Sequence, residues 1–233
     1  MGYQTITLTD SKEGDYLYKE AVKTLRTNIQ FSGKDNKTIL LTSCFSNEGK
    51  SDISFHLAVE MGKAGKKVLL VDSDLRKSVY VSRYAIPEQT IGLSEYLSGQ
   101  MENLEELIYK TNYQNVYMIM AGHFVLNPAE LLDSEMFGTM LKTLRKVFDY
   151  VLVDTPPLGV VVDAAVIGQF CDSSLIVIES GAVSYKEAQK VKKQLEKSGC
   201  KVLGAVLNKI EVKSGKYYAG KYRKYAYEGY GEE

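Results

Sequence analysis

The alternation of apolar and polar residues predicts strands and helices in turn along the chain. Short runs of Val, Ile and Leu, typical of buried strands, alternate with longer stretches in which apolar residues recur every three or four positions, typical of amphipathic helices. Strands are expected at 38–42, 67–71, 116–120, 150–153, 174–178 and 202–207, and helices at 16–31, 50–64, 134–148 and 185–198. Shorter helices are expected at 92–97, 104–109 and 127–132. This order predicts an α/β fold with βαβ units around a parallel sheet.

Two helices carry more detailed predictions. Leu17, Ala21, Leu25 and Ile29 are four residues apart, so we expect them to form the buried face of the first helix. Asn127 precedes a proline, which the first helical turn tolerates, and its side chain is expected to cap the free amides of that turn.

Composition places the chain among ordinary globular proteins. It has 233 residues, 45% of them hydrophobic and 25% charged, and a formal net charge of zero. That balance argues against nucleic acid as the main partner, because nucleic-acid-binding proteins usually carry a basic excess. There is no apolar run of membrane-spanning length and no secretory pattern at the N-terminus. The sequence therefore predicts a soluble, cytoplasmic protein whose membrane contacts depend on a partner.

Aliphatic side chains almost disappear after residue 212. We expect residues 1–212 to form one folded domain and residues 213–233 to form a flexible tail, because a segment without aliphatic residues cannot bury a core. The tail combines basic residues with a cluster of tyrosines, namely Tyr217, Tyr218, Tyr222, Tyr225, Tyr227 and Tyr230. An alternative for such an aromatic, basic segment is binding to nucleic acid or to a protein partner.

A phosphate-binding loop is predicted between the strand at 38–42 and the helix that follows it. In such a loop, backbone amides surround the phosphates, a lysine reaches their oxygens and a hydroxyl binds Mg²⁺. The residues expected to contact the nucleotide there are Asn47, Glu48, Gly49, Lys50, Ser51 and Asp52. The alternative is an ordinary loop with a chance Gly-Lys-Ser.

Two residues depart from the usual loop sequence. Cys44 stands where the first glycine is usual, and Asp52 follows Ser51. A carboxylate at position 52 would repel the α-phosphate unless the side chain turns away. The sequence therefore predicts weaker nucleotide binding than a threonine at this position would give.

Carboxylates follow two other apolar strands. Asp154 ends the run at 150–153, and Asp72 and Asp74 close the run at 68–71. Residues two apart on a strand share a face, so Asp72 and Asp74 could point into one site. One carboxylate could then hold a metal while another accepts a hydroxyl proton. The alternative is solvated aspartates at strand ends.

These motifs together resemble the bacterial tyrosine kinases of capsular and exopolysaccharide synthesis. The resemblance rests on Gly-Lys-Ser at 49–51, Asp-Ser-Asp-Leu-Arg at 72–76, Asp-Thr-Pro-Pro at 154–157 and the tyrosine-rich C-terminus. The chain looks like the Gram-positive type, in which the cytoplasmic kinase is separate from its membrane activator. The resemblance implies a P-loop NTPase-like fold related to the MinD and ParA ATPases.

The resemblance also implies roles for individual residues. ATP and Mg²⁺ would be the cofactors, with Lys50 on the phosphates and Ser51, Asp74 and Asp154 around the metal. Lys50, Asp72 and Asp74 would be catalytic, with Asp72 favoured for activating the tyrosine hydroxyl, although the division between the two aspartates stays open. By analogy with related ATPases, Asn208 is the candidate contact for adenine.

The same resemblance implies partners. The tail tyrosines would accept phosphate in trans, a transmembrane chain-length regulator would activate the kinase, and a cognate tyrosine phosphatase would reverse the reaction. Glu20, Lys23 and Arg26 resemble a subunit-contact motif of ring-shaped oligomers, with Lys23 in place of an arginine, and their spacing predicts that they face one way on a helix.

Two other classes stay open. A partitioning or division-site switch ATPase would share the fold, but its signature lysine five residues before Lys50 is Phe45 here. A non-catalytic scaffold would require Asp52 to have disabled the site.

Overall fold

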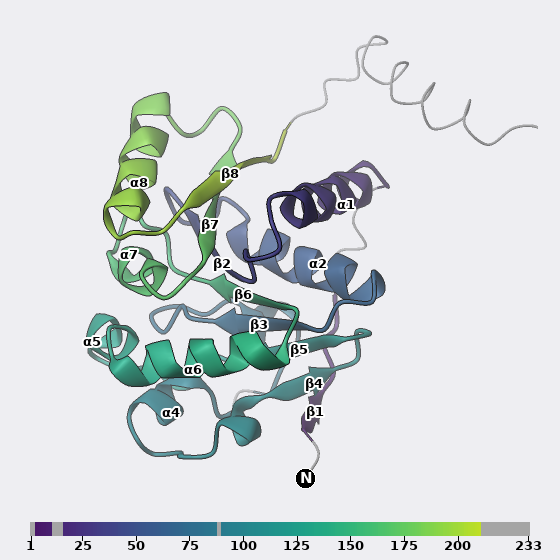
Figure 1. The fold of residues 1–233 in the computed structure, drawn as a ribbon, viewed down its shortest axis with the longest axis vertical. Helices are drawn as coiled ribbons and strands as arrows, with labels where there is room; N and C mark the ends of the chain where they lie inside the picture. The colour runs from purple at the N-terminus through teal and green to yellow at the C-terminus, as the bar shows by residue number, and fades with distance from the viewer. Residues whose placement is uncertain (1–2, 11–15, 88–89, 211–233) are drawn as a thin grey trace, which may run out of the picture.

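The computed structural model describes residues 3–10, 16–87 and 90–210, and in this part of the chain one eight-stranded sheet lies between two layers of helices (Figure 1). The strands are β1 (Gln4–Ile6), β2 (Thr38–Ser43), β3 (Val68–Asp72), β4 (Tyr109–Thr111), β5 (Val116–Ile119), β6 (Tyr150–Asp154), β7 (Ser173–Glu179) and β8 (Val202–Asn208). Their spatial order is β1-β4-β5-β3-β6-β2-β7-β8. All pairs are parallel except β4 with β5. The predicted α/β fold is confirmed.

The helices cover both faces of this sheet. They are α1 (Tyr16–Phe31), α2 (Lys50–Lys63), α3 (Tyr80–Arg83), α4 (Leu93–Leu97), α5 (Pro128–Leu132), α6 (Glu135–Val147), α7 (Asp163–Gly168) and α8 (Tyr185–Lys197), with a 3₁₀ turn at Leu104–Leu107. Helices α1 and α2 lie on one side, and α4 to α8 on the other (Figure 1). Parallel sheets need this double cover because both of their faces are apolar.

Alternation along the central strands divides the core into two layers. In β2 every residue is buried; Leu40 packs toward α6, whereas Ile39 and Leu41 pack toward α2. Successive side chains of a strand point to opposite faces, so one apolar run supplies both layers. This is why the predicted strands read as continuous hydrophobic runs and agree with the structure to within one or two residues.

The shortest elements differ from the predictions. β1 and β4 have three residues each, and α3 and α7 have four and six, which is too short to show a period, and none of them was predicted. The helix expected at 104–109 is a single 3₁₀ turn, and Tyr109 already begins β4. None of the helices in the described ranges is long and apolar enough to cross a membrane.

The predicted buried face of α1 is wrong in its first half. Leu17 is 44% exposed and Ala21 is also exposed, whereas Val22 and Ile29 are buried against α2. Residues spaced strictly four apart drift around a helix that has 3.6 residues per turn. The face of α1 that contacts α2 combines spacings of three and four residues. The side chain of Asn127 makes no capping hydrogen bond to α5, and its Nδ2 donates to Glu130.

Replacement of Gly62 by alanine is expected to destabilise the fold. A Cβ there would lie 2.3 Å from the carbonyl oxygen of Gln114 and 2.8 Å from Val116 Cγ2, so α2 would have to move away from β5. We expect Gly62→Ala to lower the free energy of unfolding by roughly 1–3 kcal/mol in chemical denaturation. The control is Gly204→Ala in β8, where a Cβ meets nothing within 4 Å. Equal stability of the two variants would contradict this packing.

Candidate active site

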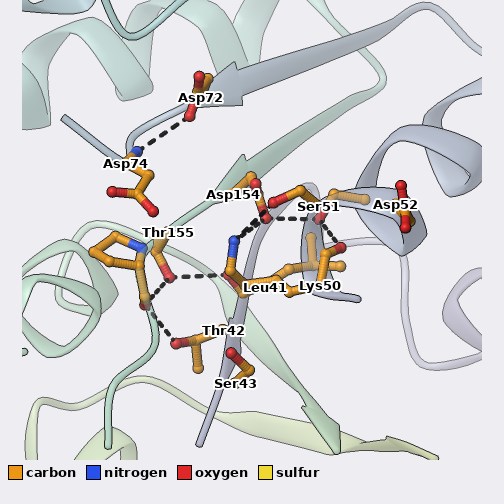
Figure 2. A network of polar contacts seen from close by, with 12 residues as sticks. Leu41, Thr42, Ser43, Lys50, Ser51, Asp52, Asp72, Asp74, Asp154 and Thr155 are labelled. Atoms are coloured by element: carbon orange, nitrogen blue, oxygen red, sulfur yellow. Dashed lines mark hydrogen bonds and ion pairs between the residues drawn. The ribbon is translucent and has the colours of Figure 1, made fainter. Parts of the chain in front are cut away.

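The carboxyl ends of β2, β3 and β6 bring the three predicted motifs together. β6 lies between β2 and β3, and the parallel register sets Asp154 opposite Asp72 on one side and opposite Leu41 on the other. Figure 2 shows Lys50, Asp154, Asp72 and Asp74 around one point at this edge. The sheet order therefore assembles residues that are about a hundred positions apart in the sequence.

The loop before α2 is bent by two left-handed residues. Asn47 has φ 67° and Gly49 has φ 86°. A Cβ on Gly49 would lie 2.1 Å from Asn208 Nδ2, so this position combines a positive φ with a close approach and requires glycine. Asn208, at the end of β8, donates to the carbonyl oxygen of Glu48 at 2.8 Å. Asn208 thus lies against the phosphate loop, and its predicted adenine contact remains a prediction.

Glu48 supports the loop from within. Its carboxylate is almost fully buried and accepts from the backbone amides of Cys44 at 2.7 Å and Phe45 at 3.0 Å. A carboxylate that accepts two amides in a buried position holds the backbone in one conformation. The sequence predicted Glu48 as a nucleotide contact, but its side chain binds the loop's own amides. Cys44, in place of the usual glycine, is accommodated with a fully buried side chain.

Lys50 and Asp154 form a buried ion pair at the centre of the site. Lys50 Nζ lies 2.8 Å from Asp154 Oδ1 and 3.1 Å from Ser51 Oγ, and Ser54 Oγ donates to the same Oδ1 at 3.0 Å. Within the described residues, Asp154 Oδ2 is buried and has no hydrogen-bond partner. A buried carboxylate oxygen without a donor is costly, and a cation is the group that would satisfy it.

Asp72 and Asp74 come together through a turn. The prediction that they share a strand face is wrong, because β3 ends at Asp72 and Asp74 lies beyond it. The amide of Asp74 donates to Asp72 Oδ1 at 3.2 Å, and Asp74 Oδ1 accepts from the amides of Arg76 and Lys77. Asp72 is fully buried, and this burial raises its pKa to about 7, although a hydrogen bond from Ser78 opposes the shift.

Arg76 joins this turn to helix α7. Its guanidinium binds Asp163 with both branches, Nε to Oδ2 at 2.7 Å and Nη2 to Oδ1 at 2.9 Å, and Asp163 is fully buried in the first turn of α7. Bidentate geometry fixes both the distance and the orientation of the pair. Sequence reasoning missed Asp163, since a single aspartate at the start of a short helix carries no signal without its partner.

Asp52 turns away from the carboxylate cluster. Figure 2 shows its side chain well apart from Asp72 and Asp74, and it forms an ion pair with Arg83 of α3. The weaker nucleotide binding expected from an acid at this position remains a prediction.

The three residues of the predicted subunit contact do not share one environment. Lys23 and Glu20 form an exposed ion pair at 2.6 Å on α1. Arg26 instead turns toward α2 and donates to the carbonyl oxygen of Glu60 at 3.4 Å. Arg26 therefore takes part in the α1–α2 contact, and the role of the three residues as a subunit contact remains a prediction. The tail tyrosines and the boundary at residue 212 lie outside the described residues.

The donor set fits a nucleotide with Mg²⁺. In the described part of the chain, no group of three His, Cys, Asp or Glu residues could hold a metal unaided. Mg²⁺ is usually bound by one or two carboxylates together with phosphate oxygens, and Asp154, Asp74 and the hydroxyl of Ser51 offer such a partial set. Lys50 and the amides at the N-terminus of α2 would hold the phosphates.

A bent loop, a buried lysine and carboxylates at the ends of neighbouring parallel strands define a P-loop nucleotide-binding domain. In agreement, residues 36–203 match the family described as AAA domain.

Comparison with known proteins identifies the family within the P-loop class. Tyrosine-protein kinase CpsD of Streptococcus pneumoniae serotype 4 is 42% identical over 199 residues, which are 85% of this chain and 87% of that one. The kinase domain of Escherichia coli tyrosine kinase ETK superposes with a TM-score of 0.79 at 33% identity, covering 85% of this chain and 78% of that one. The cell division ATPase MinD of Pyrococcus furiosus superposes with a TM-score of 0.66 at 27% identity, covering 77% and 74%. The chain belongs to the bacterial tyrosine-protein kinase family.

Loss of the Glu48 carboxylate is expected to weaken nucleotide binding. Glu48→Ala leaves the amides of Cys44 and Phe45 without their acceptor, so the loop loses two contacts that hold its conformation. We expect the affinity for a fluorescent ATP analogue to fall about tenfold, since a hydrogen bond to a charged group contributes roughly 1.5–3 kcal/mol. Glu48→Gln, which keeps one acceptor oxygen, should lose less. Unchanged affinity in Glu48→Ala would show that the loop does not need this support.

Asp72 should make the ligand-free protein less stable as the pH rises. Its folded pKa of about 7 lies above the ordinary aspartate value of 3.8, so its contribution to stability is full below pH 4 and is lost as the pH rises toward 7. We expect Asp72→Asn to gain stability over the unsubstituted chain between pH 5 and pH 8, on the order of 2 kcal/mol. The measurement is urea denaturation without Mg²⁺ or nucleotide. A pH-independent difference would contradict the raised pKa.

Proposed function

We propose that this protein transfers the γ-phosphoryl group of ATP to its own C-terminal tyrosines, between subunits, and thereby regulates capsule or exopolysaccharide synthesis and export. The observation that carries the catalytic part is the cluster of Lys50, the first residue of α2, with Asp154 and Asp72 at the ends of β6 and β3. The tail sequence, rich in tyrosine and basic residues, supports the choice of acceptor.

Each residue of the cluster has a role in this proposal. Lys50 and the amides of the loop hold the phosphates, while Ser51, Asp74 and Asp154 hold Mg²⁺, which neutralises charge on the phosphate oxygens when bound. Asp72 accepts the proton of the tyrosine hydroxyl as the phenolic oxygen bonds to the γ-phosphorus and ADP leaves. A pKa near 7 suits a general base that works at neutral pH.

The tail and its partners complete the proposal. Basic residues at 216, 221, 223 and 224 would draw the tail toward the phosphates of a neighbouring subunit. Each phosphate added brings about −1.5 to −2 charges, which would turn the tail acidic and release it. Oligomerisation into a ring, activation by a transmembrane chain-length regulator and reversal by a tyrosine phosphatase belong to the same proposal, and would place the protein at the inner face of the cell membrane.

A switch ATPase is the second candidate, and the structural likeness to MinD favours it as an alternative. Phe45 occupies the position of the signature lysine of that class, and this argues for the kinase.

The experiment is to incubate the full chain in Mg·ATP, with and without the activator's cytoplasmic segment, and to map phosphotyrosine by mass spectrometry. We expect phosphate on the tyrosines of residues 217–230, and none when Lys50→Met is incubated alone, because the lysine that binds phosphate is gone. ATP hydrolysis without phosphotyrosine would instead indicate the switch ATPase.

A mixing experiment tests transfer between subunits. Lys50→Met, with its tyrosines intact, serves as the acceptor, and a chain with phenylalanine at the six tail tyrosines serves as the donor. Phosphate on the Lys50→Met chain supports transfer in trans. Its absence, when the unsubstituted chain does phosphorylate itself, would show that each tail is used by its own subunit.

A further inference from the structure

Helix α3 is docked on the first turn of α2 by two side chains. Tyr80, which is fully buried, donates its hydroxyl to the carbonyl oxygen of Ser51 at 3.1 Å. Arg83, at the other end of α3, forms an ion pair with Asp52, and the two side chains are 35% and 19% exposed. Burial raises the pKa of Tyr80 well above its usual value, and the charge of nearby Asp154 adds to this, so the hydroxyl stays protonated as a donor.

Asp52 lies where its charge can affect nucleotide binding. It is the third residue of α2 and lies in the turn whose free amides carry the positive end of the helix dipole. A carboxylate there stabilises the helix, but it also competes with bound phosphates for the same positive potential. An acid at this position therefore opposes nucleotide binding unless a nearby cation compensates for it.

We propose that Arg83 is an affinity-determining residue for the nucleotide, because it neutralises Asp52 and holds the carboxylate on the side of α3. The inference rests on the nucleotide site of the proposed function. Arg83 acts through Asp52 and is a positioning residue in this scheme. The unusual acid and its cation lie next to each other. Asp52 is the departure from the usual loop sequence, and Arg83, the last residue of α3, forms an ion pair with it.

The same helix connects the phosphate loop to the carboxylates of β3. Two residues before Tyr80, Ser78 donates its hydroxyl to Asp72, and the Tyr80 amide donates to Ser78 Oγ at 3.3 Å. Because α3 has only one turn, these contacts at its start and the Arg83 ion pair at its end fix it as one unit. The charge of Arg83 is therefore held at a defined position beside the N-terminus of α2.

The test is the affinity of the full-length protein for a fluorescent ATP analogue, measured without phosphoryl transfer for four chains: unsubstituted, Arg83→Gln, Asp52→Thr and the double variant. Arg83→Gln removes the positive charge that pairs with Asp52 at the N-terminus of α2, so the affinity should fall about tenfold. Asp52→Thr should bind as well as the unsubstituted chain or more tightly. The double variant should return to within about threefold of the unsubstituted chain, since both charges are gone.

Two controls separate charge from folding. Arg83→Lys keeps the cation and should bind within about threefold of the unsubstituted chain. Arg145→Gln removes a guanidinium that is 39% exposed, close to the value for Arg83, from an ion pair with Asp172 at the opposite end of the sheet, and should leave the affinity unchanged. Urea denaturation of each variant establishes that the measured chains are folded.

The outcomes are decisive. Affinity of Arg83→Gln within twofold of the unsubstituted chain, in folded protein, would overturn the inference. A double variant as weak as Arg83→Gln would also overturn it, because Arg83 would then act independently of Asp52. Absence of tail phosphorylation would count against the proposed function and leave this binding result untouched, so the two proposals fail separately.

Discussion

The buried ion pair between Lys50 and Asp154 is the contact on which the rest of the site depends. It joins the phosphate loop to the end of β6, and both side chains are almost completely removed from water. Two charges can be buried in this way only when each compensates for the other and further hydrogen bonds are made, here from Ser54 and to Ser51. The pair therefore fixes the first turn of α2 relative to the sheet, and the other predicted site residues are arranged around it.

Three side-chain contacts position the phosphate loop and the turn after β3. Arg76 fastens the turn after β3 to Asp163 in α7, Ser78 binds Asp72, and Glu48 holds the amides of the phosphate loop. Arg76, Ser78 and Glu48 lie in loops next to helices. Apolar packing alone would not hold the backbone of such segments in one conformation. Polar contacts with strict geometry supply the precision that a phosphoryl-transfer site needs.

The tyrosine-protein kinases and the MinD ATPase share one fold but have different activities. The fold delivers a phosphate loop and carboxylates at strand ends, which serve any P-loop enzyme. In the proposed function, Phe45 in the loop and the tyrosines after residue 212 separate the kinase from the switch ATPase. Asp52 departs from the usual loop sequence, and in this structure it pairs with Arg83.

The sequence by itself determined the α/β fold, the six longer strands and the three motifs, because strand period, glycine geometry and the chemistry of phosphate binding are local properties. It could not determine β1, β4, α3 or α7, which are too short to show a period, nor the turn that brings Asp74 back to Asp72. The partners Asp163 and Arg83, and the turning of Arg26 toward α2, were decided by tertiary structure alone. Such contacts join segments far apart in the chain, and only the packing of the layers selects which charged side chains meet.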